Sequence, residues 1–289
     1  MDSKEEFLIL LDLLAQAIKA VRVSSIEDDN QREKLIYAHN LANRFIQYAL
    51  TQLHLCNDKN VETLPSLGDV RVSDPGSIDV LTRAAMEAFL VFHCVFYSPA
   101  TEDEKDYRYW TYKAAGLIER QNLPDGVFEH AEQKVEERKT LEEIIAKLGS
   151  NPIYEALTAK QKMRYIEGKG WNLWRRDRDP KRAMSWQDIA TDAGLSVILA
   201  SYMYKNLSGQ AHSGSLSVLQ TQQAIVRNEA DRLISPSINT MKILVANMIY
   251  EYIKLFPEAQ PVLAKSGAST FVDTWIRIGQ RLGDNLSAT

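Results

Sequence analysis

Residues 186–215, WQDIATDAGLSVILASYMYKNLSGQAHSGS, predict two consecutive helices around which the rest of the chain is organised. Ser185 and Asp188 have the spacing of a capping box, which predicts that a short helix begins at Trp186. Gly194 stands where such a helix would end, and a second helix is predicted over about 195–211. Four polar residues recur on it at spacings of three and four and so share one face: Ser201, Tyr204, Ser208 and His212. Since the other positions are mostly apolar, this polar face needs partners inside the fold.

The partners are predicted far upstream, in the segment Ser77–Tyr97, SIDVLTRAAMEAFLVFHCVFY. Asp79, Arg83 and Glu87 lie at i, i+4 and i+8 on an otherwise almost wholly apolar helix. We expect the two helices to pack side by side and to share one polar site. Two interpretations stay open: Arg83 binds an anion and Glu87 takes part in acid–base chemistry, or the two form an ion pair that fixes helix packing.

The composition is that of a globular protein. The chain has 289 residues, 45% hydrophobic and 25% charged, and its formal net charge of −4 by itself indicates neither nucleic-acid nor membrane binding. Cys56 and Cys94 both lie in apolar helical contexts, which favours buried thiols in a reducing compartment. The sequence has no basic leader and no apolar run of about 18 residues. We therefore expect a cytoplasmic protein that does not bind a membrane.

The rest of the chain also has helical periodicity, which predicts an all-α bundle of roughly ten helices. Further helices are predicted over about 3–21, 30–55, 101–120, 127–148, 216–233, 235–255 and 270–282, with a loop over 57–77. Ser235–Pro236 has the composition of an N-cap and first helical residue, so the helix over 235–255 is expected to begin there. We expect one all-helical domain over 1–289, made of N-terminal helices in 1–56, a core of 77–121 and 185–256, a charged and basic insert over about 127–182, and a C-terminal helix over 270–282.

The helix predicted over 127–148 is highly charged and has only a thin apolar stripe. The stripe consists of Phe128, Ala131, Val135, Leu141, Ile145 and Leu148. Such a helix lies on the surface or projects as an arm. A protein partner is therefore one binding partner that the sequence predicts, through this charged helix.

The segment Lys160–Arg182 is basic in a chain that is acidic overall, with nine Lys or Arg against three acidic residues. It also contains Trp171 and Trp174. Phosphate contact combined with base stacking requires this mixture, so RNA is a second predicted partner, with Trp174, Arg175, Arg176 and Arg178 as candidate binding residues. The alternative is a solvated charged face.

The sequence lacks the familiar motifs of catalytic and phosphate-binding sites. The candidate catalytic residues therefore come from the residue types at one helix end. The sequence has no phosphate-binding glycine loop, no CxxC, no HExxH and no GxSxG. No two of the five histidines stand at i and i+4, so neither a metal pair on one helix nor a cofactor is predicted. His212 follows a helix that carries a cation at Lys205, and a histidine in this setting can act as a general acid or base near neutral pH. The alternative is that His212 hydrogen-bonds to Ser208 or Glu87 and ties two helices together.

Two blocks, Ser73–Phe96 and Ser185–Ser215, resemble the bacterial all-helical family catalogued as domain of unknown function 5677. The family pattern is an Arg-x-x-x-Glu helix, followed far downstream by Trp and then by a Tyr-x-x-Leu-Ser-x-x-x-His helix. It falls here on Arg83, Glu87, Trp186, Tyr204, Leu207, Ser208 and His212. The similarity extends over about residues 30–255, and the family carries no assigned activity.

Lys205-Asn206 followed by His212 resembles the motif of the HEPN superfamily of helical toxins and antiphage ribonucleases. The motif has Arg, then a polar residue, then His after four to six residues. This chain departs from it by having Lys205 in place of Arg, and lysine cannot form the bidentate fork on phosphate. Gly209 also falls inside the spacing. The resemblance implies a site at a homodimer interface.

Three functions therefore stand as hypotheses. The first is a HEPN-like, metal-independent ribonuclease or phage-defence toxin. In it His212 would be the acid–base group, Lys205 and Arg83 would hold phosphate, and Glu87, Tyr204, Asn206 and Ser208 would assist. The second is a non-catalytic helical interaction protein in which the Arg, Glu, Ser and His form a structural polar core. The third is a pocket that senses a small anionic ligand.

Overall fold

The computed structural model describes residues 3–23, 26–56, 61–66, 68–71, 75–124, 131–168, 184–211, 214–227 and 230–282. Within these ranges the chain forms thirteen α-helices, one π-helix, one 3-10 helix and a two-stranded hairpin, which confirms the predicted all-α fold. The chain divides into two compact units. The first, here called the discontinuous unit, comprises Met1–Phe92 and Ala190–Thr289, and the second, the inserted unit, comprises His93–Ile189.

The discontinuous unit is built from nine helical elements and the hairpin. In chain order they are α1 (Ser3–Ala20), α2 (Asp29–Leu55), β1 (Val61–Leu64), β2 (Gly68–Arg71), α3 (Pro75–Phe92), α9 (Val197–Ala211), α10 (Ser215–Arg227), α11 (Ala230–Leu255), the 3-10 turn η3 (Pro257–Ala259), α12 (Gln260–Ser266) and α13 (Ser269–Arg281). The short helix α8 (Trp186–Asp192) lies at the sequence boundary between the two units.

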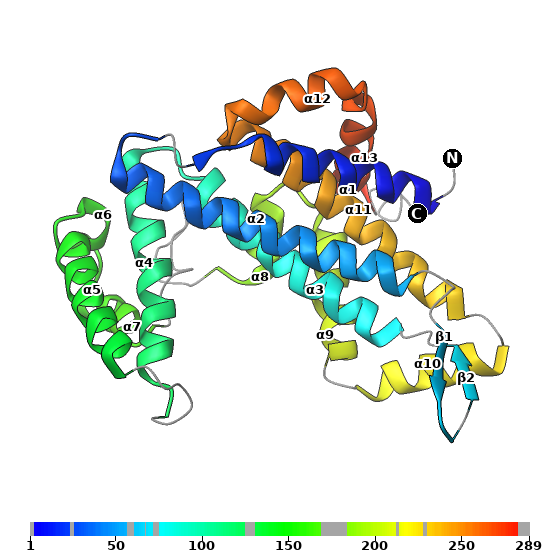
Figure 1. The fold of residues 1–289 in the computed structure, drawn as a ribbon. Helices are drawn as coiled ribbons and strands as arrows, with labels where there is room; N and C mark the ends of the chain where they lie inside the picture. The colour runs from blue at the N-terminus through cyan, green and yellow to red at the C-terminus, as the bar shows by residue number, and fades with distance from the viewer. Residues whose placement is uncertain are drawn as a thin grey trace. The chain divides into compact units, whose positions relative to one another are not determined.

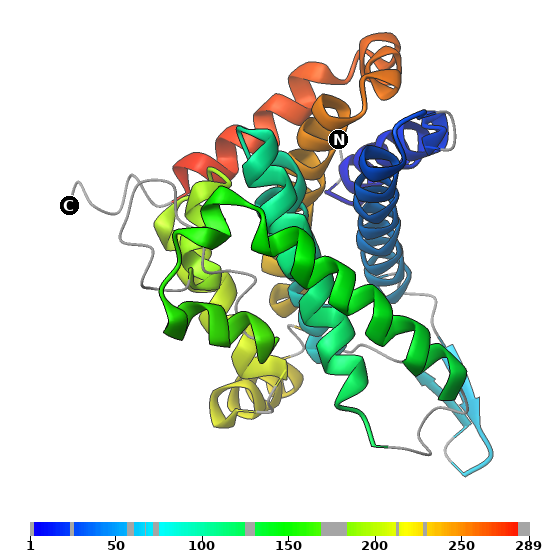
Figure 2. The ribbon, with the colours of Figure 1, turned by 90° about the vertical axis from the view of Figure 1, so that its left-hand side faces the viewer.

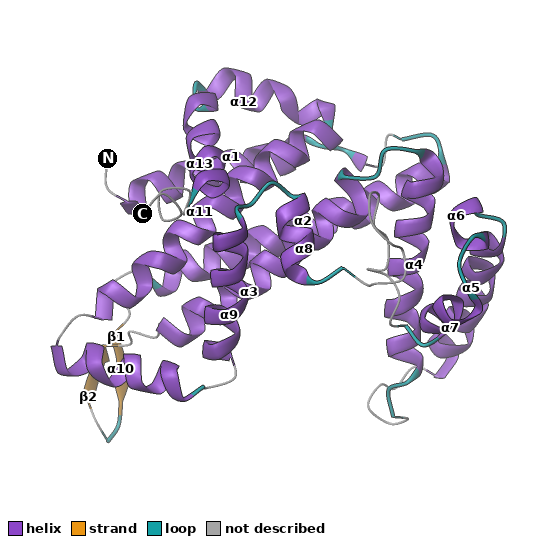
Figure 3. Cartoon of the chain, turned by 180° about the vertical axis from the view of Figure 1, so that it is seen from behind, coloured by secondary structure: helices purple, strands orange, loops and turns teal. Residues whose placement is uncertain are grey.

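Helix α3 forms the centre of the discontinuous unit, because it packs against α2, α9 and α11 (Figures 1 and 3). A helix that is covered on several sides must be apolar nearly all round. The almost wholly apolar sequence of this segment predicted such a position. Ile78, Ala85, Phe89 and Phe92 on α3 are fully buried. The partner helix α11 buries an almost continuous apolar run, which includes Met241, Leu244, Val245, Met248 and Ile249.

The terminal helices also pack on α11, with α1 and α13 both in contact with it. Gly279 of α13 makes this approach possible, because a Cβ built there would lie 2.5 Å from Cγ2 of Ile243. The Gly279 carbonyl also accepts a hydrogen bond from the Ser196 N–H at 3.0 Å, which joins α13 to the segment that leads into α9.

The junction of α8 and α9 follows the prediction. The Asp188 carboxylate accepts from the Ser185 N–H at 2.8 Å, and the Ser185 hydroxyl accepts from the Asp188 N–H at 3.2 Å, which completes the capping box. Gly194 ends α8 with φ of +80°, and the Leu195 N–H reaches back to the Ala190 carbonyl. These are the marks of a Schellman stop, which orients the start of α9.

The inserted unit consists of the π-helix η2 (His93–Tyr97), α4 (Glu102–Gln121), α5 (Ala131–Gly149), α6 (Pro152–Glu155) and α7 (Ala159–Ile166). Helix α4 contacts η2, α5, α6 and α7, so it is the spine of this unit (Figure 2). Three tyrosines pack together in its core: the Tyr107 and Tyr165 hydroxyls are hydrogen-bonded, and Tyr154 packs edge-on against Tyr165. The unit is larger than the insert predicted over 127–182, since α4 packs on the elements that follow it.

The surface position predicted for the charged helix is correct, but the face that it buries matches the predicted stripe only in part. Helix α5 packs along α4 through Glu137, Ile144 and Leu148, which are buried, whereas Val135 and Ile145 are exposed. The buried carboxylate of Glu137 accepts from Arg120 at 2.5 Å and from Gln133 at 2.9 Å. An acidic side chain therefore occupies a core-facing position, which a search for apolar residues alone overlooks.

Two other boundaries differ from prediction. Pro236 does not begin a helix but lies inside α11, which starts at Ala230. The packing of Ile234, Ser237 and Ile238, all buried, outweighs the local cost of proline there. The predicted loop over 57–77 contains the antiparallel hairpin β1–β2, in which Leu64 pairs with Gly68.

The segment Pro75–Tyr97 is long and apolar enough to cross a membrane by length and composition. However, 67% of its most apolar window is buried within the fold, as in the core helix of a protein that crosses no membrane. The segment by itself is therefore weak evidence for a membrane.

Candidate functional site

The polar site predicted between the two helices is present in the discontinuous unit. Arg83 of α3 donates from Nη1 to the Ser208 hydroxyl of α9 at 2.6 Å, and from Nε to the Glu87 carboxylate at 3.0 Å. This group of three is called the Arg83 cluster below. Its ion pair is partly exposed, since the Arg83 and Glu87 side chains keep 22% and 36% of their accessible surface. The cluster therefore lies at the edge of the helix interface and not in the core.

Helix α9 places these residues through its two contrasting faces. Leu199, Ala200, Met203 and Leu207 are buried and hold the helix against the unit. Ser201, Lys205 and Ser208 follow one another at spacings of four and three, so they share the outer side of the helix. Ser208 stands where this outer side meets α3, which is why the Arg83 side chain reaches it.

A shallow hollow of about 360 Å³ lies on the outer side of α9. It is lined by Ile198, Ser201, Tyr202, Lys205 and Asn206, and is called the α9 hollow below. The Asn206 amide donates to the Tyr202 hydroxyl at 3.3 Å, so two of the lining side chains hold each other. Lys205 is exposed and has no acidic partner within the part of the chain that the structure describes.

A buried carboxyl of α3, Asp79, acts electrostatically on Tyr202. Asp79 of α3 is 4% exposed and accepts a hydrogen bond from the Ser237 hydroxyl of α11. Burial raises the pKa of Asp79 to about 6, and the hydrogen bond from Ser237 offsets part of this rise. Burial also raises the pKa of Tyr202, and the negative charge of Asp79 adds to that shift.

The other residues predicted for the site are distributed unevenly. Asn206 lines the α9 hollow, whereas Tyr204 is 41% exposed and does not line it. His212 directly follows α9 and lies outside the described residues. The predicted RNA-binding residues Trp174, Arg175, Arg176 and Arg178 also lie outside them.

The contributions of Ile198 and Tyr202 to the hollow, and the electrostatic effect of Asp79 on Tyr202, were not predicted from the sequence. Tyr202 was overlooked because it does not share the spacing of Tyr204, Ser208 and His212. The recurrence of Ile198, Tyr202 and Asn206 at i, i+4 and i+8 is a signal that could have identified this second face.

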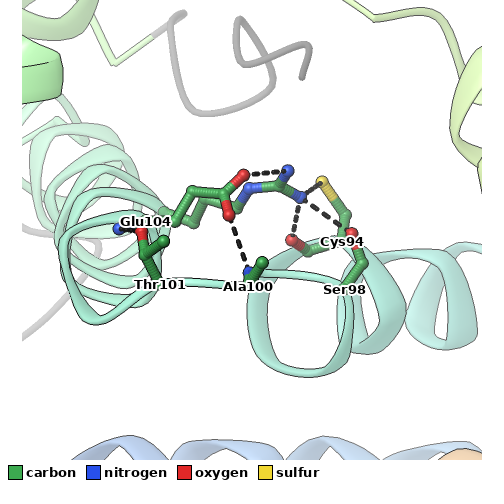
Figure 4. Close-up of polar contacts among 6 residues, drawn as sticks. Cys94, Ser98, Ala100, Thr101 and Glu104 are labelled. Carbon is green, nitrogen blue, oxygen red and sulfur yellow. Dashed lines mark hydrogen bonds and ion pairs between the residues drawn. The ribbon is translucent and has the colours of Figure 1, made fainter. Parts of the chain in front are cut away.

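The inserted unit contains a second, deeply buried polar cluster around Arg108, which is 3% exposed (Figure 4). Its Nη1 donates to the Cys94 carbonyl at 2.5 Å and to the Ser98 hydroxyl at 3.3 Å, and its Nη2 lies 3.4 Å from the Glu104 carboxylate. The other Glu104 oxygen accepts from the Ala100 N–H at 2.7 Å. Arg108 therefore places a cation at the C-terminal end of the π-helix, where free carbonyls and the helix dipole favour one.

A second hollow, of about 520 Å³, lies between α1 and α12 in the discontinuous unit. Ile9, Leu13 and Val262 contribute apolar surface to it, and Asp12, Glu258 and Lys265 contribute charges of both signs. Among the described residues, no group of three or more His, Cys, Asp or Glu is arranged to hold a metal ion.

Comparisons with known proteins found no match: no family model, no curated protein and no solved structure is similar to this chain. The resemblances to the two helical families therefore rest on the residues quoted above alone.

Proposed function

We propose that this protein is a metal-independent ribonuclease that holds RNA on the outer side of α9. Lys205 would contact the phosphate, and His212, seven residues further along the chain, would be the acid–base group. Cleavage without a metal needs a proton acceptor for the ribose 2′-hydroxyl and a cation where negative charge develops on the phosphate. These two residue types stand at the spacing of the HEPN-like motif.

The observation that carries the proposal is that Lys205 is exposed and has no acidic partner among the described residues. Its ammonium group is exposed beside the α9 hollow and is not neutralised by a described acidic residue. Arg83 of α3 adds a second cation near Lys205. Its guanidinium is hydrogen-bonded to Ser208, which lies about one turn along α9 from Lys205. The charge of Arg83 is balanced by Glu87, so Lys205 provides the net positive charge of this surface.

The HEPN resemblance also implies a homodimer formed through this part of the fold. Apolar side chains that a second copy could cover are exposed on α9 and α10, where Val197 is 68%, Val218 60% and Val226 79% exposed. Sedimentation equilibrium of the purified protein tests this part of the proposal, because a monomer at micromolar concentration would contradict it.

The test of the activity is cleavage of total RNA and tRNA by the purified protein in the presence of EDTA. Lys205→Ala and His212→Ala should each abolish cleavage, and the loss for His212→Ala should be about 10²–10⁴-fold, the usual contribution of general acid–base catalysis. Lys19→Ala is the matched control, since Lys19 is also exposed but lies on α1. All variants should retain the helical circular dichroism of the wild type. Intact RNA after incubation with wild type would refute the proposal.

A second candidate is a non-catalytic helical protein in which the Arg83 cluster only ties α3 to α9. The observation that favours it is that the Nε and Nη1 donors of Arg83 are already bonded and the side chain is mostly buried. In that case Ser208→Ala should lower the thermal stability of the protein, and no variant in α9 should change the integrity of RNA.

A further inference from the structure

We infer that the α9 hollow is a subsite for one unpaired nucleotide, with the ring of Tyr202 as the stacking surface for its base. This inference rests on RNA being the ligand of α9, as proposed above. It goes further by naming the group that the hollow accepts and the side chain that recognises it.

The size and openness of the hollow suit a single nucleotide. Its volume of about 360 Å³ is near the lower end of the range of small-molecule sites, about 300–1,000 Å³. It lies on the exposed side of one helix and is not enclosed between elements. A base presented by a passing single strand can therefore enter it without the chain opening.

The lining provides each contact that an unpaired nucleotide needs. Tyr202, 40% exposed, has an aromatic face, and Ile198, 44% exposed, adds aliphatic surface beside it. Every base has a flat π-face, so an exposed tyrosine ring binds bases by stacking. Lys205, also in the lining, places an ammonium group where a phosphate can meet it.

Asn206 adds the capacity to pair with a base edge. Its hydrogen bond to the Tyr202 hydroxyl uses one of the two N–H donors of the amide. An asparagine side chain has a second N–H and a carbonyl oxygen, and such a donor–acceptor pair is complementary to the edge of a base. The same bond restrains Tyr202, so that less side-chain freedom is lost when a base stacks.

The described lining contains no carboxylate, its only charge is the cation of Lys205, and most of its exposed surface is apolar. A cationic ligand would be repelled by Lys205, whereas the flat face of a base can cover the apolar surface. The chemistry that fits the whole lining is an aromatic heterocycle attached to a phosphate.

The test uses a fluorescein-labelled single-stranded oligonucleotide whose 2′-positions are all O-methylated, so that it binds but cannot be cleaved. Fluorescence anisotropy gives its affinity for wild type and variants at fixed salt. Tyr202→Ala should weaken binding by roughly 5- to 150-fold, the range for the loss of one base stacked on an aromatic ring. Tyr202→Phe keeps the ring and should bind within a few-fold of wild type. Tyr37→Ala is the matched control, because Tyr37 is 38% exposed on α2, away from the hollow.

Competition separates a nucleotide subsite from a simple anion site. Adenosine and uridine monophosphates should displace the oligonucleotide at lower concentration than ribose 5-phosphate or inorganic phosphate. Equal competition by all four, or a Tyr202→Ala variant that binds like wild type at unchanged melting temperature, would overturn the inference. If Tyr202→Phe binds as weakly as Tyr202→Ala, stacking is not the cause and the inference also fails.

The outcomes distinguish this inference from the proposed activity. If wild type binds the methylated strand through Tyr202 but leaves natural RNA intact, the nucleotide subsite stands and the ribonuclease proposal fails. If wild type cleaves RNA but Tyr202→Ala binds normally, the activity stands and the subsite fails. If wild type neither binds the strand nor cleaves natural RNA, both fail.

Discussion

The Arg83 guanidinium donates a hydrogen bond to the Ser208 hydroxyl at 2.6 Å, and this bond joins α3 to α9 across 125 positions of sequence. Glu87 holds the same guanidinium from one turn along α3. Because the pair keeps part of its surface in water, its removal should cost less than the removal of a fully buried pair. This relationship gives a first prediction.

Glu87→Ala should lower the free energy of unfolding by about 1 kcal/mol or less, as is usual for an ion pair that touches water. A buried pair would have cost about 3–5 kcal/mol, and the partial exposure of Arg83 and Glu87 argues against that value. The midpoint of urea unfolding of wild type and variant measures the difference. A decrease of several kcal/mol would mean that the cluster is buried more deeply than the structure shows.

The second prediction concerns Lys242 of α11, which is 1% exposed. Its ammonium group lies 3.0 Å from the Glu6 carboxylate of α1 and 4.7 Å from the ring centre of Trp275 in α13. Glu6→Ala removes a carboxylate from a cation that stays buried, so it should cost about 3 kcal/mol. Lys242→Met fills similar space without a charge and should cost less than about 1.5 kcal/mol.

The measurement is again denaturant unfolding, and the informative quantity is the order of the two variants. Glu6 keeps 26% of its side-chain surface in water, so it can be hydrated when Lys242 is replaced, whereas the Lys242 side chain is only 1% exposed. Equal decreases in stability, or a larger decrease for Lys242→Met, would contradict this account.

The third prediction concerns pH. The folded-state pKa of Asp79 is raised from 3.8 to about 6, so the folded protein holds this proton more tightly than the unfolded chain. The stabilisation is complete below pH 3.8 and is lost as the pH rises through about 6. Between pH values of about 5 and 7.5, wild type should therefore lose about 1.4 kcal/mol that Asp79→Asn does not lose.

Unfolding in urea at the two pH values, for wild type and Asp79→Asn, tests this prediction. Tyr202 lies near Asp79, but its pKa is raised from an already high value and it stays neutral throughout this range. Parallel pH profiles for the two proteins would show that Asp79 does not titrate within the window.

The fourth prediction concerns the basic segment 160–182, most of which lies outside the described residues. If it binds RNA, Arg175→Glu, Arg176→Glu and Arg178→Glu together should weaken binding of single-stranded RNA. The slope of log affinity against log salt should become shallower by roughly 0.7 for each phosphate that the variant no longer neutralises. A variant with Lys19, Arg138 and Lys139 changed to Glu has the same net charge and is the control. Equal weakening by both variants would leave only a general charge effect.

Much of the helical framework was predictable because its signals are local. The capping box of Ser185 and Asp188 and the stop at Gly194 involve residues a few positions apart, so they appear in sequence and structure alike. The i, i+4 spacing places Arg83 and Glu87 on one face of α3, and helical spacing places Ser208 on the polar face of α9. These faces predicted that the side chains meet. Helical periodicity orders such side chains before any tertiary contact forms.

The candidate site was predictable only in part. The HEPN-like motif identified Lys205 and Asn206, but the aromatic ring that lines the hollow with them belongs to Tyr202, which is not part of that motif. The buried Asp79, whose charge raises the pKa of Tyr202, belongs to α3, so no spacing within α9 could indicate it.

The all-α class, the caps of α8 and the polar positions on α3 and α9 were predictable from the sequence, because they follow from propensities and spacings within short segments. Only the tertiary structure decided that Pro236 lies inside α11, that Glu137 lies on the buried face of α5, and that the Arg83 cluster is partly exposed. Burial depends on which distant elements cover a residue, and the free energy of that packing exceeds the local preferences that a sequence displays.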